Sequence, residues 1–131
     1  MVWGPKPKSV WARGEQAAAR YMRKQGCRVI ARNLRLPIGE IDLLCLEKST
    51  GTVVVVEVKA RSYSENTSRD IDPVASITAR KRAKLVSLAK SIKKKPRFAA
   101  SAIRIDVISV RFEAGRRKPV IRHYPGCVSD S

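Results

Sequence analysis

The feature that most constrains the fold is a run of four valines followed by Glu-Val-Lys, at residues 53–59. Successive side chains of a β-strand point to opposite faces of its sheet, so this run is apolar on both faces. A strand of that kind is covered on both sides, as in proteins whose sheet lies between helices. The run therefore predicts a covered strand, with Glu57 and Lys59 sharing one face.

A second acidic strand comes shortly before the first. Residues 38–44 read Ile-Gly-Glu-Ile-Asp-Leu-Leu, and the turn sequence Lys-Ser-Thr-Gly at 48–51 predicts a hairpin that joins the two strands. Glu40 and Asp42 share a face of this strand. If the two acidic faces coincide, three carboxylates and one ammonium converge. Crowded carboxylates repel each other unless a hard divalent cation such as Mg²⁺ neutralises them.

Apolar periodicity and turn residues predict two helices. Ser9 is placed to cap a helix over about 10–25, which Gly26 would end in a left-handed conformation. The second helix is expected over about 73–94, with Asp72 as its cap. Five strands are expected, including the two acidic ones, at about 28–35, 39–47, 52–61, 102–110 and 119–124.

The order of these elements predicts an α/β fold, with a mixed central sheet flanked by helices. A chain of 131 residues is long enough for one domain with one hydrophobic core. We expect a basic N-terminal arm over 1–9, a single domain over 10–124 and a tail over 125–131.

The charge of the chain is strongly unbalanced. It has 28 Lys and Arg against 11 Asp and Glu, a net charge of +17. Such self-repulsion is easiest to rationalise with a polyanionic partner, and the absence of a basic amphipathic helix with large apolar anchors favours nucleic acid over a membrane surface. Residues 73–105 contain no acidic side chain, whereas a face kept only for solubility mixes signs. The candidate phosphate-binding residues are Arg61, Arg80, Lys81, Arg82, Lys84, Lys93, Lys94, Lys95 and Arg97.

The cysteines and the N-terminus indicate a reducing compartment. The three cysteines are far apart and form no C-x-x-C pair, which argues against a zinc site. Cys45 lies in an apolar strand and is expected to be a buried thiol. The first eight residues lack the apolar region of a signal peptide, so we expect a cytoplasmic protein.

Phosphodiester hydrolysis is the chemistry that best uses these residues. Asp42 and Glu57 are the expected Mg²⁺ or Mn²⁺ ligands, one from each strand, and the Val58 carbonyl is a further candidate. Lys59 is placed to orient the attacking water or to stabilise charge on the phosphate. Glu15 is expected to approach the site from the first helix.

Each of these assignments has a plainer alternative. Glu57 and Lys59 also fit an ordinary charge pair on a strand. Glu40 is either a further ligand, a base behind the ligands, or the partner of a basic neighbour. Lys81 lies on the apolar stripe of the second helix, where a lysine either reaches the solvent rim or points into the site. Trp11 is expected in the core, with stacking on nucleic-acid bases as its alternative.

Taken together, these motifs resemble the YraN-type family of small bacterial proteins, which are regarded as predicted endonucleases. The resemblance is carried by Gly14-Glu15-x-Ala17-Ala18, Arg32-Asn33, Gly39-Glu-Ile-Asp-Leu43 and Glu57-Val-Lys59-x-Arg61. It covers about residues 10–110. The family is similar to archaeal Holliday-junction resolvases and belongs to the PD-(D/E)xK, restriction-endonuclease-like superfamily, which implies an αβββαβ core.

The resemblance also implies roles for individual residues. Asp42 and Glu57 match the metal ligands of the superfamily, and Lys59 matches its catalytic lysine. Glu15 and Lys81 match a glutamate of the first helix and a lysine of the second. Ile41 replaces the proline that usually precedes the aspartate, and Asp106 matches an aspartate of a later strand. From the residues themselves, we expect Asp106 to pair structurally with Arg104 or a helix lysine, and His123 to be a structural residue.

Three functions remain open from the sequence. The first is a metal-dependent endonuclease acting on DNA, with branched DNA as a candidate substrate and a homodimer as a candidate assembly. The second is a non-catalytic nucleic-acid-binding module on a nuclease fold. The third is a basic protein bound to ribosomal RNA.

Overall fold

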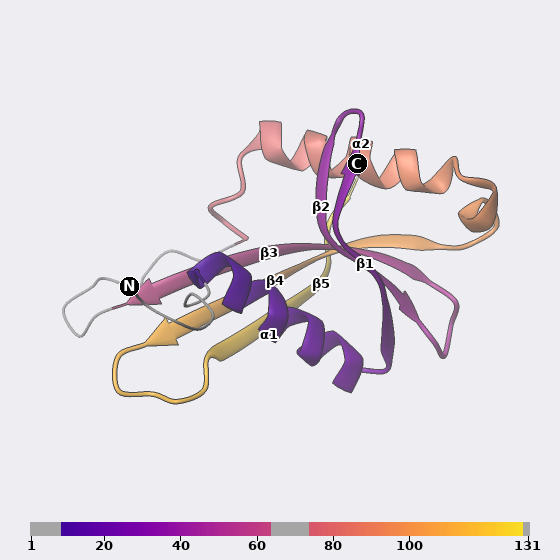
Figure 1. The fold of residues 1–131 in the computed structure, drawn as a ribbon. Coiled ribbons are helices and arrows are strands. Elements are labelled where there is room, and N and C mark those ends of the chain that lie inside the picture. The colour runs from indigo at the N-terminus through magenta and orange to yellow at the C-terminus, as the bar shows by residue number, and fades with distance from the viewer. Residues whose placement is uncertain (1–8, 64–73, 130–131) are drawn as a thin grey trace, which may run out of the picture.

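The computed structural model describes residues 9–63 and 74–129. A five-stranded sheet lies between two helices, and the strands are ordered as they occur in the chain (Figure 1). All neighbouring strands are antiparallel except β3 and β4, which are parallel and joined through α2. The element bounds are α1 Val10–Lys24, β1 Cys27–Leu36, β2 Gly39–Glu47, β3 Val53–Tyr63, α2 Ala79–Lys93, β4 Ile103–Glu113 and β5 Val120–Val128.

The sheet separates two hydrophobic cores. Val54, Val56 and Val58 of β3 pack with the α1 side, while Val53 and Val55 pack with the α2 side. The run of four valines thus faces both helices, as its lack of alternation predicts. The mixed α/β fold and the αβββαβ order are confirmed, with β5 added at the edge.

Local signals position α1 as expected. The Ser9 side chain accepts a hydrogen bond from the Ala12 N–H, and this caps the helix. Gly26 follows the helix with a φ of 88°, a left-handed conformation that glycine adopts without steric cost. Trp11 is 41% exposed, so its predicted place in the core is wrong. It lies in the first turn of α1.

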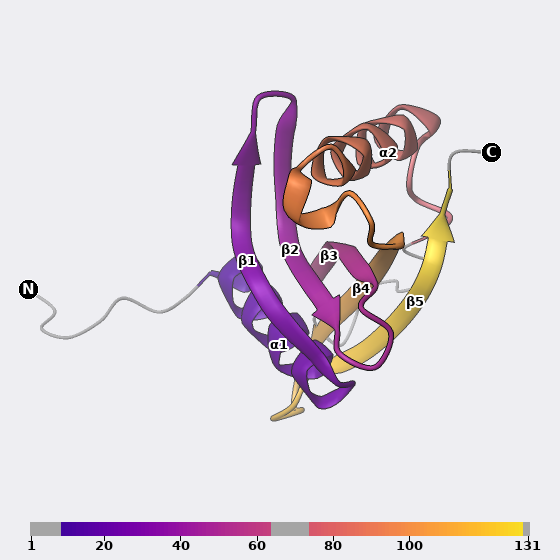
Figure 2. The same cartoon turned by 90° about the vertical axis from the view of Figure 1, so that its right-hand side faces the viewer.

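The β1–β2 hairpin leaves the plane of the sheet at its outer end. The ladder between β2 and β3 runs from Leu46 and Val53 to Leu43 and Val56. Beyond this last pair, β2 departs from β3, and the hairpin rises beside α2 (Figures 1 and 2). This divergence creates a gap between the two acidic strands.

The second helix begins later than the sequence suggests. Its cap is Thr78, whose side chain accepts a hydrogen bond from the Lys81 N–H, and the expected start at about residue 73 is wrong. Residues 74–77 form a turn closed by a bond from the Ile77 N–H to the Val74 carbonyl. Ile77 is buried although it lies before the helix begins. The row of apolar residues from which the helix was predicted therefore starts earlier in the chain than the helix itself. The predicted cap Asp72 lies outside the described residues.

The last strand is longer than expected. It continues through Pro125 to Val128, although the strand was expected to end at about residue 124. Two features allow this extension: β5 is an edge strand, where a proline is tolerated, and Gly126 has a φ of 60° beside a register irregularity. Val128 is buried in the core on the α2 side.

A close approach between α1 and β3 fixes the height of the first helix above the sheet. A Cβ atom on Gly14 would lie 2.4 Å from the Cβ atom of Ala60. We expect Gly14→Ala to lower the free energy of unfolding by about 1–3 kcal/mol, although alanine gains about 1 kcal/mol of helix propensity. Urea denaturation measures the change. The double variant Gly14→Ala, Ala60→Gly should recover part of the lost free energy of unfolding, because the clashing methyl group of Ala60 is then absent. If the losses of the two single variants simply add, the close contact between positions 14 and 60 is contradicted.

Candidate active site

Asp42 lies where β2 and β3 separate. Its Oδ2 atom accepts a hydrogen bond of 2.8 Å from the Val58 N–H, two residues beyond the last paired position of β3. The carboxylate thus takes the place of a main-chain acceptor that the departing strand no longer offers. The fold therefore places a charged side chain against the middle of β3.

Glu57 and Lys59 lie together on the α2 side of the sheet. Their side chains follow the face of Val53 and Val55, and Lys59 Nζ is 4.0 Å from Glu57 Oε1. The shared face predicted from the strand period is therefore present. Lys81 of α2 also reaches this position, with Nζ 3.5 Å from the same Glu57 oxygen. Two ammonium groups thus flank the carboxylate of Glu57, whose side chain is only 9% exposed.

Glu15 approaches from the opposite helix. Its Oε1 atom accepts a hydrogen bond of 2.8 Å from Asn33 Nδ2, whereas its buried Oε2 atom has no hydrogen-bond partner among the described residues. Burial raises the pKa of Glu15, despite the opposing effects of Asn33 and Arg32. The result is a carboxyl group with one anchored oxygen and one oxygen open to a proton or a cation.

Asn33 holds Glu15 in place, a role that was not predicted from the sequence. It has a φ of 48°, a left-handed conformation that asparagine tolerates better than most residues. The residues on either side of it are paired across the β1–β2 ladder, Arg32 with Leu43 and Leu34 with Ile41. Asn33 therefore lies opposite Asp42 in the register. The Arg32-Asn33 motif was the one feature of the sequence that could have indicated Asn33 as a site residue. The role in holding Glu15 appears only when α1 packs on the sheet.

The electrostatics centre on Asp42. Burial raises its pKa from 3.8 to about 7, with Glu57 as the next contribution, while the Val58 N–H and Lys81 oppose the shift and Glu15 adds to it. Asp42 therefore interacts with charged groups from α1, β3 and α2. A cation in the gap would stabilise the ionised form of this carboxyl group.

Glu40 has a basic neighbour on β1, although its charge also raises the pKa of Glu15. Its Oε2 atom lies 3.9 Å from Nε of Arg35, its cross-strand partner, and its side chain is largely exposed. No group of three or more Asp, Glu, His or Cys side chains within residues 9–63 and 74–129 is arranged to hold a metal ion. The structure thus does not bring three carboxylates together as the strand faces suggested.

The remaining donors still fit a magnesium-type cation. Mg²⁺ is commonly bound by one or two carboxylates and keeps several waters. Asp42 and Glu57 supply two carboxylates, and the unpartnered Glu15 oxygen offers a further acceptor on the α1 side. The Val58 amide is engaged by Asp42, and its carbonyl as a ligand stays a prediction.

Asp106 belongs to a separate structural network, as expected. It is fully buried and binds Arg104 at 3.0 Å, His123 at 2.7 Å and the Gly126 N–H at 2.9 Å. The other ring nitrogen of His123 lies 3.3 Å from the Tyr21 hydroxyl on α1. This network joins β4, β5 and α1, and both residues therefore have structural partners.

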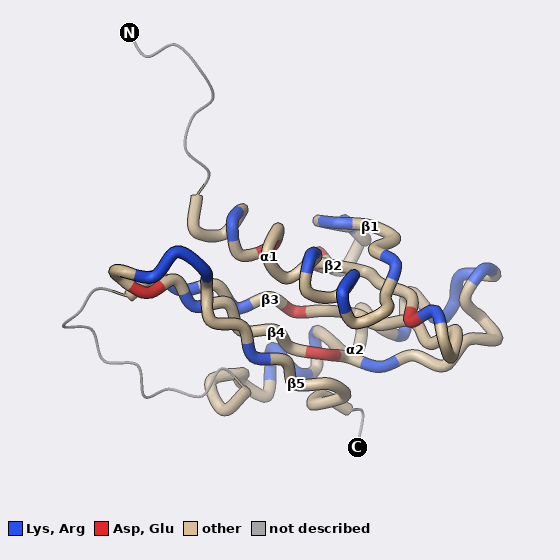
Figure 3. The backbone as a smooth tube through the Cα atoms, turned by 90° about the horizontal axis from the view of Figure 1, so that it is seen from below, with Lys and Arg blue, Asp and Glu red and all other residues tan. Residues whose placement is uncertain are grey.

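Basic residues lie on both helices and on every strand except β2 (Figure 3). Arg80, Lys84, Lys94, Lys95 and Arg97 are exposed, whereas Lys81, Arg82 and Lys93 are partly covered. Arg61 is exposed at the end of β3 and donates a hydrogen bond of 2.8 Å to the Ala60 carbonyl. No helix in the described ranges has the length and apolar character needed to cross a membrane.

The fold and the site define a small α/β protein with an acidic and lysine-lined site where two central strands diverge. A family comparison identifies the protein further. The model of the uncharacterised protein family UPF0102 matches residues 14–110, and the chain belongs to this family. The YraN-type resemblance is thereby confirmed.

The curated relatives cover most of the chain. A UPF0102 protein of Pelotomaculum thermopropionicum is 40% identical over 112 residues, which is 85% of this chain and 88% of the relative. A UPF0102 protein of Desulfosudis oleivorans is 39% identical over 98 residues, 75% of each chain.

Two solved structures share part of the fold. A repair endonuclease from Pyrococcus abyssi is 16% identical with a TM-score of 0.47, covering 86% of this chain and 42% of that one. The structure described as an EndoMS–dsDNA complex is 14% identical with a TM-score of 0.44, covering 80% and 38%. This chain spans less than half of either, and neither likeness supports a statement about its activity.

Proposed function

We propose that this protein is a metal-dependent nuclease that hydrolyses phosphodiester bonds in DNA. The observation that carries the proposal is the pairing of Asp42, in the gap between β2 and β3, with Glu57 and Lys59 on the adjoining strand. The net charge of +17 around this acidic site supports a polyanionic substrate. Branched DNA is the candidate substrate within this class.

The residues divide the chemical work between them. Asp42 and Glu57, with the Val58 carbonyl, would hold Mg²⁺ or Mn²⁺, which lowers the pKa of a bound water and polarises the phosphate when it is present. The Lys59 ammonium orients the attacking water or stabilises charge on the phosphate. Glu15, with its raised pKa and open oxygen, holds or accepts a proton on the α1 side.

A cleavage assay tests this function. Labelled single strands, duplex, flap and four-way junction are incubated with Mg²⁺ or Mn²⁺, and wild type is compared with Asp42→Ala. We expect metal-dependent cleavage that falls by at least about 100-fold in the variant while DNA binding stays intact or tightens. Glu47→Gln, which changes a carboxylate at the far end of β2, is the matched control and should cleave normally. Undiminished cleavage by Asp42→Ala would disprove the assignment.

A non-catalytic nucleic-acid-binding module is the second candidate. It is favoured by the absence of a three-ligand metal group from the part of the chain that the structure describes. The two candidates differ in their response to metal without any substrate. A nuclease site should raise the melting temperature when Mn²⁺ is added, and Asp42→Ala should remove that increase. A pure binding module should show salt-dependent DNA binding that is indifferent to both changes.

A further inference from the structure

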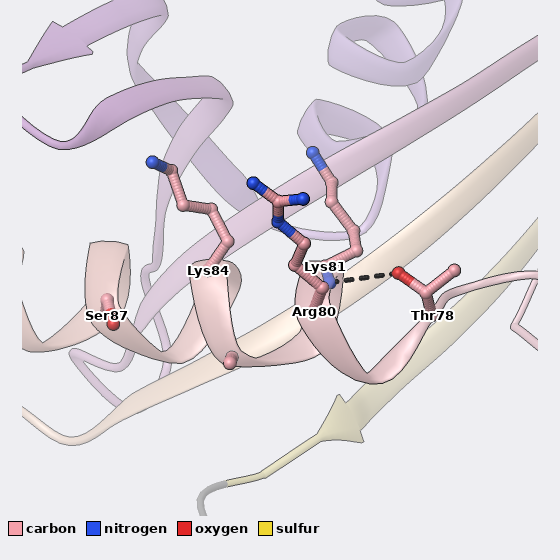
Figure 4. A pocket seen from close by; sticks show the side chains of 6 residues that line it. Thr78, Arg80, Lys81, Lys84 and Ser87 are labelled. Carbon is pink, nitrogen blue, oxygen red and sulfur yellow. Dashed lines mark hydrogen bonds between the residues drawn. The ribbon is translucent and has the colours of Figure 1, made fainter.

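A basic groove runs along the first turns of α2, next to the candidate active site. It has a volume of about 470 Å³. Figure 4 shows the side chains of Arg80, Lys81 and Lys84 extending from the same side of the helix. The residues that line the groove are Thr78, Arg80, Lys81, Ala83, Lys84 and Ser87.

The lining has the chemistry of a phosphate site. Three of its six side chains are cations and two are hydroxyls, and none is acidic or large and apolar. Lys, Arg, Ser and Thr are the side chains that commonly contact nucleic-acid phosphates. The Thr78 oxygen accepts the Lys81 N–H at 3.1 Å, which leaves the hydroxyl hydrogen available to donate. Such a lining does not suit an apolar small molecule.

The spacing along the helix suits a chain of phosphates. Arg80 and Lys84 are four residues apart, and Lys81 and Lys84 are three apart, so these residues lie on adjacent turns with their Cβ atoms about 5–6 Å from each other. Cations in such a row contact successive phosphates of one strand. A single phosphorylated metabolite would use only one end of the row.

Lys81 joins the groove to the acidic site. It lines the groove, and its Nζ atom is 3.5 Å from Glu57 Oε1. The side chain of Lys81 is 40% exposed, against 9% for Glu57, so the lysine reaches both solvent and the buried carboxylate. A phosphate bound in the groove at Lys81 would therefore lie next to the acidic site of Asp42 and Glu57.

The β1–β2 hairpin lies against one of the groove residues, Lys84. A Cβ atom on Gly39 would lie 2.7 Å from Lys84 Cε, so the turn of the hairpin rests against this lysine. Glycine at this position lets the main chain approach without displacing the Lys84 side chain. The hairpin that diverges from β3 beside Asp42 thus also contacts the groove residue Lys84.

Other cations of α2 have different tasks. The Arg82 guanidinium donates to the Val74 carbonyl at 3.5 Å, and the Lys93 ammonium donates to the Ser101 carbonyl. Neither residue lines the groove. These two residues hold the segments that precede and follow α2, which sets them apart from the groove residues within the same basic helix.

We propose that this groove binds the backbone phosphates of one DNA strand and leads that strand to the Asp42–Glu57 site. The inference rests on the proposed function and adds the path of the substrate. In this arrangement Lys84 and Arg80 contact phosphates away from the scissile bond, and Lys81 contacts the phosphate nearest to it. The contacts are made to the backbone, so the groove does not distinguish base sequences.

Measuring DNA binding in the absence of metal tests the proposed path of the strand along the groove separately from cleavage. Fluorescence anisotropy measures the affinity of full-length protein for labelled DNA in EDTA, where the proposed cleavage cannot occur. We expect Lys84→Glu to weaken binding by at least about 10-fold and to reduce the dependence of log K on log salt by about 1. Lys48→Glu, with the same charge change at the exposed β2–β3 turn, is the matched control and should change affinity by less than about threefold. Lys84→Gln should give an intermediate loss.

The outcomes separate the groove from the function. If Lys84→Glu and Lys48→Glu weaken DNA binding equally, only the overall charge of the protein matters, and the assignment of the groove as the path of the DNA strand is wrong. Unchanged binding by Lys84→Glu, together with metal-dependent cleavage by wild type, would overturn the groove and leave the nuclease standing. Absence of DNA binding by wild type would overturn both.

Discussion

Replacing Asp42 with asparagine is expected to stabilise the protein while abolishing its proposed metal-dependent activity. The pKa of Asp42 is raised from 3.8 to about 7, chiefly by burial and then by Glu57, so the fold favours the neutral form. Asparagine is neutral at every pH, and its side-chain oxygen still accepts a hydrogen bond from the Val58 N–H. We expect the free energy of unfolding to rise by on the order of 2–4 kcal/mol at about pH 8.

The pH dependence of this gain follows from the direction of the shift. Below about pH 4 the carboxyl group is neutral in both folded and unfolded protein, so the substitution changes little. Between about pH 4 and pH 7 the unfolded chain ionises first, and the cost of the native aspartate grows. Above about pH 7 the full cost applies, and the gain from asparagine levels off.

Urea denaturation in EDTA across this pH range measures the effect. Glu40→Gln removes an exposed carboxylate from the same strand and is the matched control, which should show no comparable gain. An equal change in stability at all pH values would mean that Asp42 titrates normally and that the gap is not a desolvated site. Adding Mn²⁺ to wild type at high pH should recover part of the lost stability.

Removing Asp106 is expected to have the opposite effect on stability. This fully buried carboxylate receives hydrogen bonds from Arg104, His123 and the Gly126 N–H. Asp106→Ala leaves three buried or partly buried donors without their acceptor, and we expect a loss of about 3–5 kcal/mol. Urea denaturation at neutral pH measures this loss.

A matched control uses the other partner of Arg104. The same guanidinium binds Glu47 at 3.0 Å near the surface, and Glu47→Ala should destabilise the protein much less than Asp106→Ala, because a surface ion pair contributes little. Similar losses in the two variants would show that the ion pair with Arg104, rather than the buried network, carries the stability.

The pH dependence of Asp106 also runs opposite to that of Asp42. Burial raises the pKa of Asp106, but hydrogen bonds from His123, Arg104 and Gly126 outweigh it and hold the pKa below 3.8. Its stabilisation is therefore complete above the ordinary pKa of about 3.9 and is lost as the pH falls through the lowered value. Asp106→Ala should remove this part of the acid lability.

Short-range signals in the sequence carried much of the fold. The alternation of a strand is set by its own backbone, so the placing of Glu57 and Lys59 on one face needed no knowledge of distant residues. The four valines required cover on both sides and so implied the two helix layers. Caps and stops were reliable where a single residue decides them, as at Ser9 and Gly26, and failed at α2, where buried Ile77 extends the apolar stripe beyond the helix.

The geometry of the site was decided by packing between elements that are distant in the chain. Glu15 meets Asn33, and Lys81 meets Glu57, only because both helices settle on a sheet of fixed register. The β1–β2 register placed Glu40 opposite Arg35, and the departure of β2 from β3 left Asp42 in the gap. The sequence by itself therefore determined which residue types lie on adjacent strands, since strand period and turns are local properties. Only the tertiary structure decided which of them share a site, because burial and approach depend on the whole packed chain.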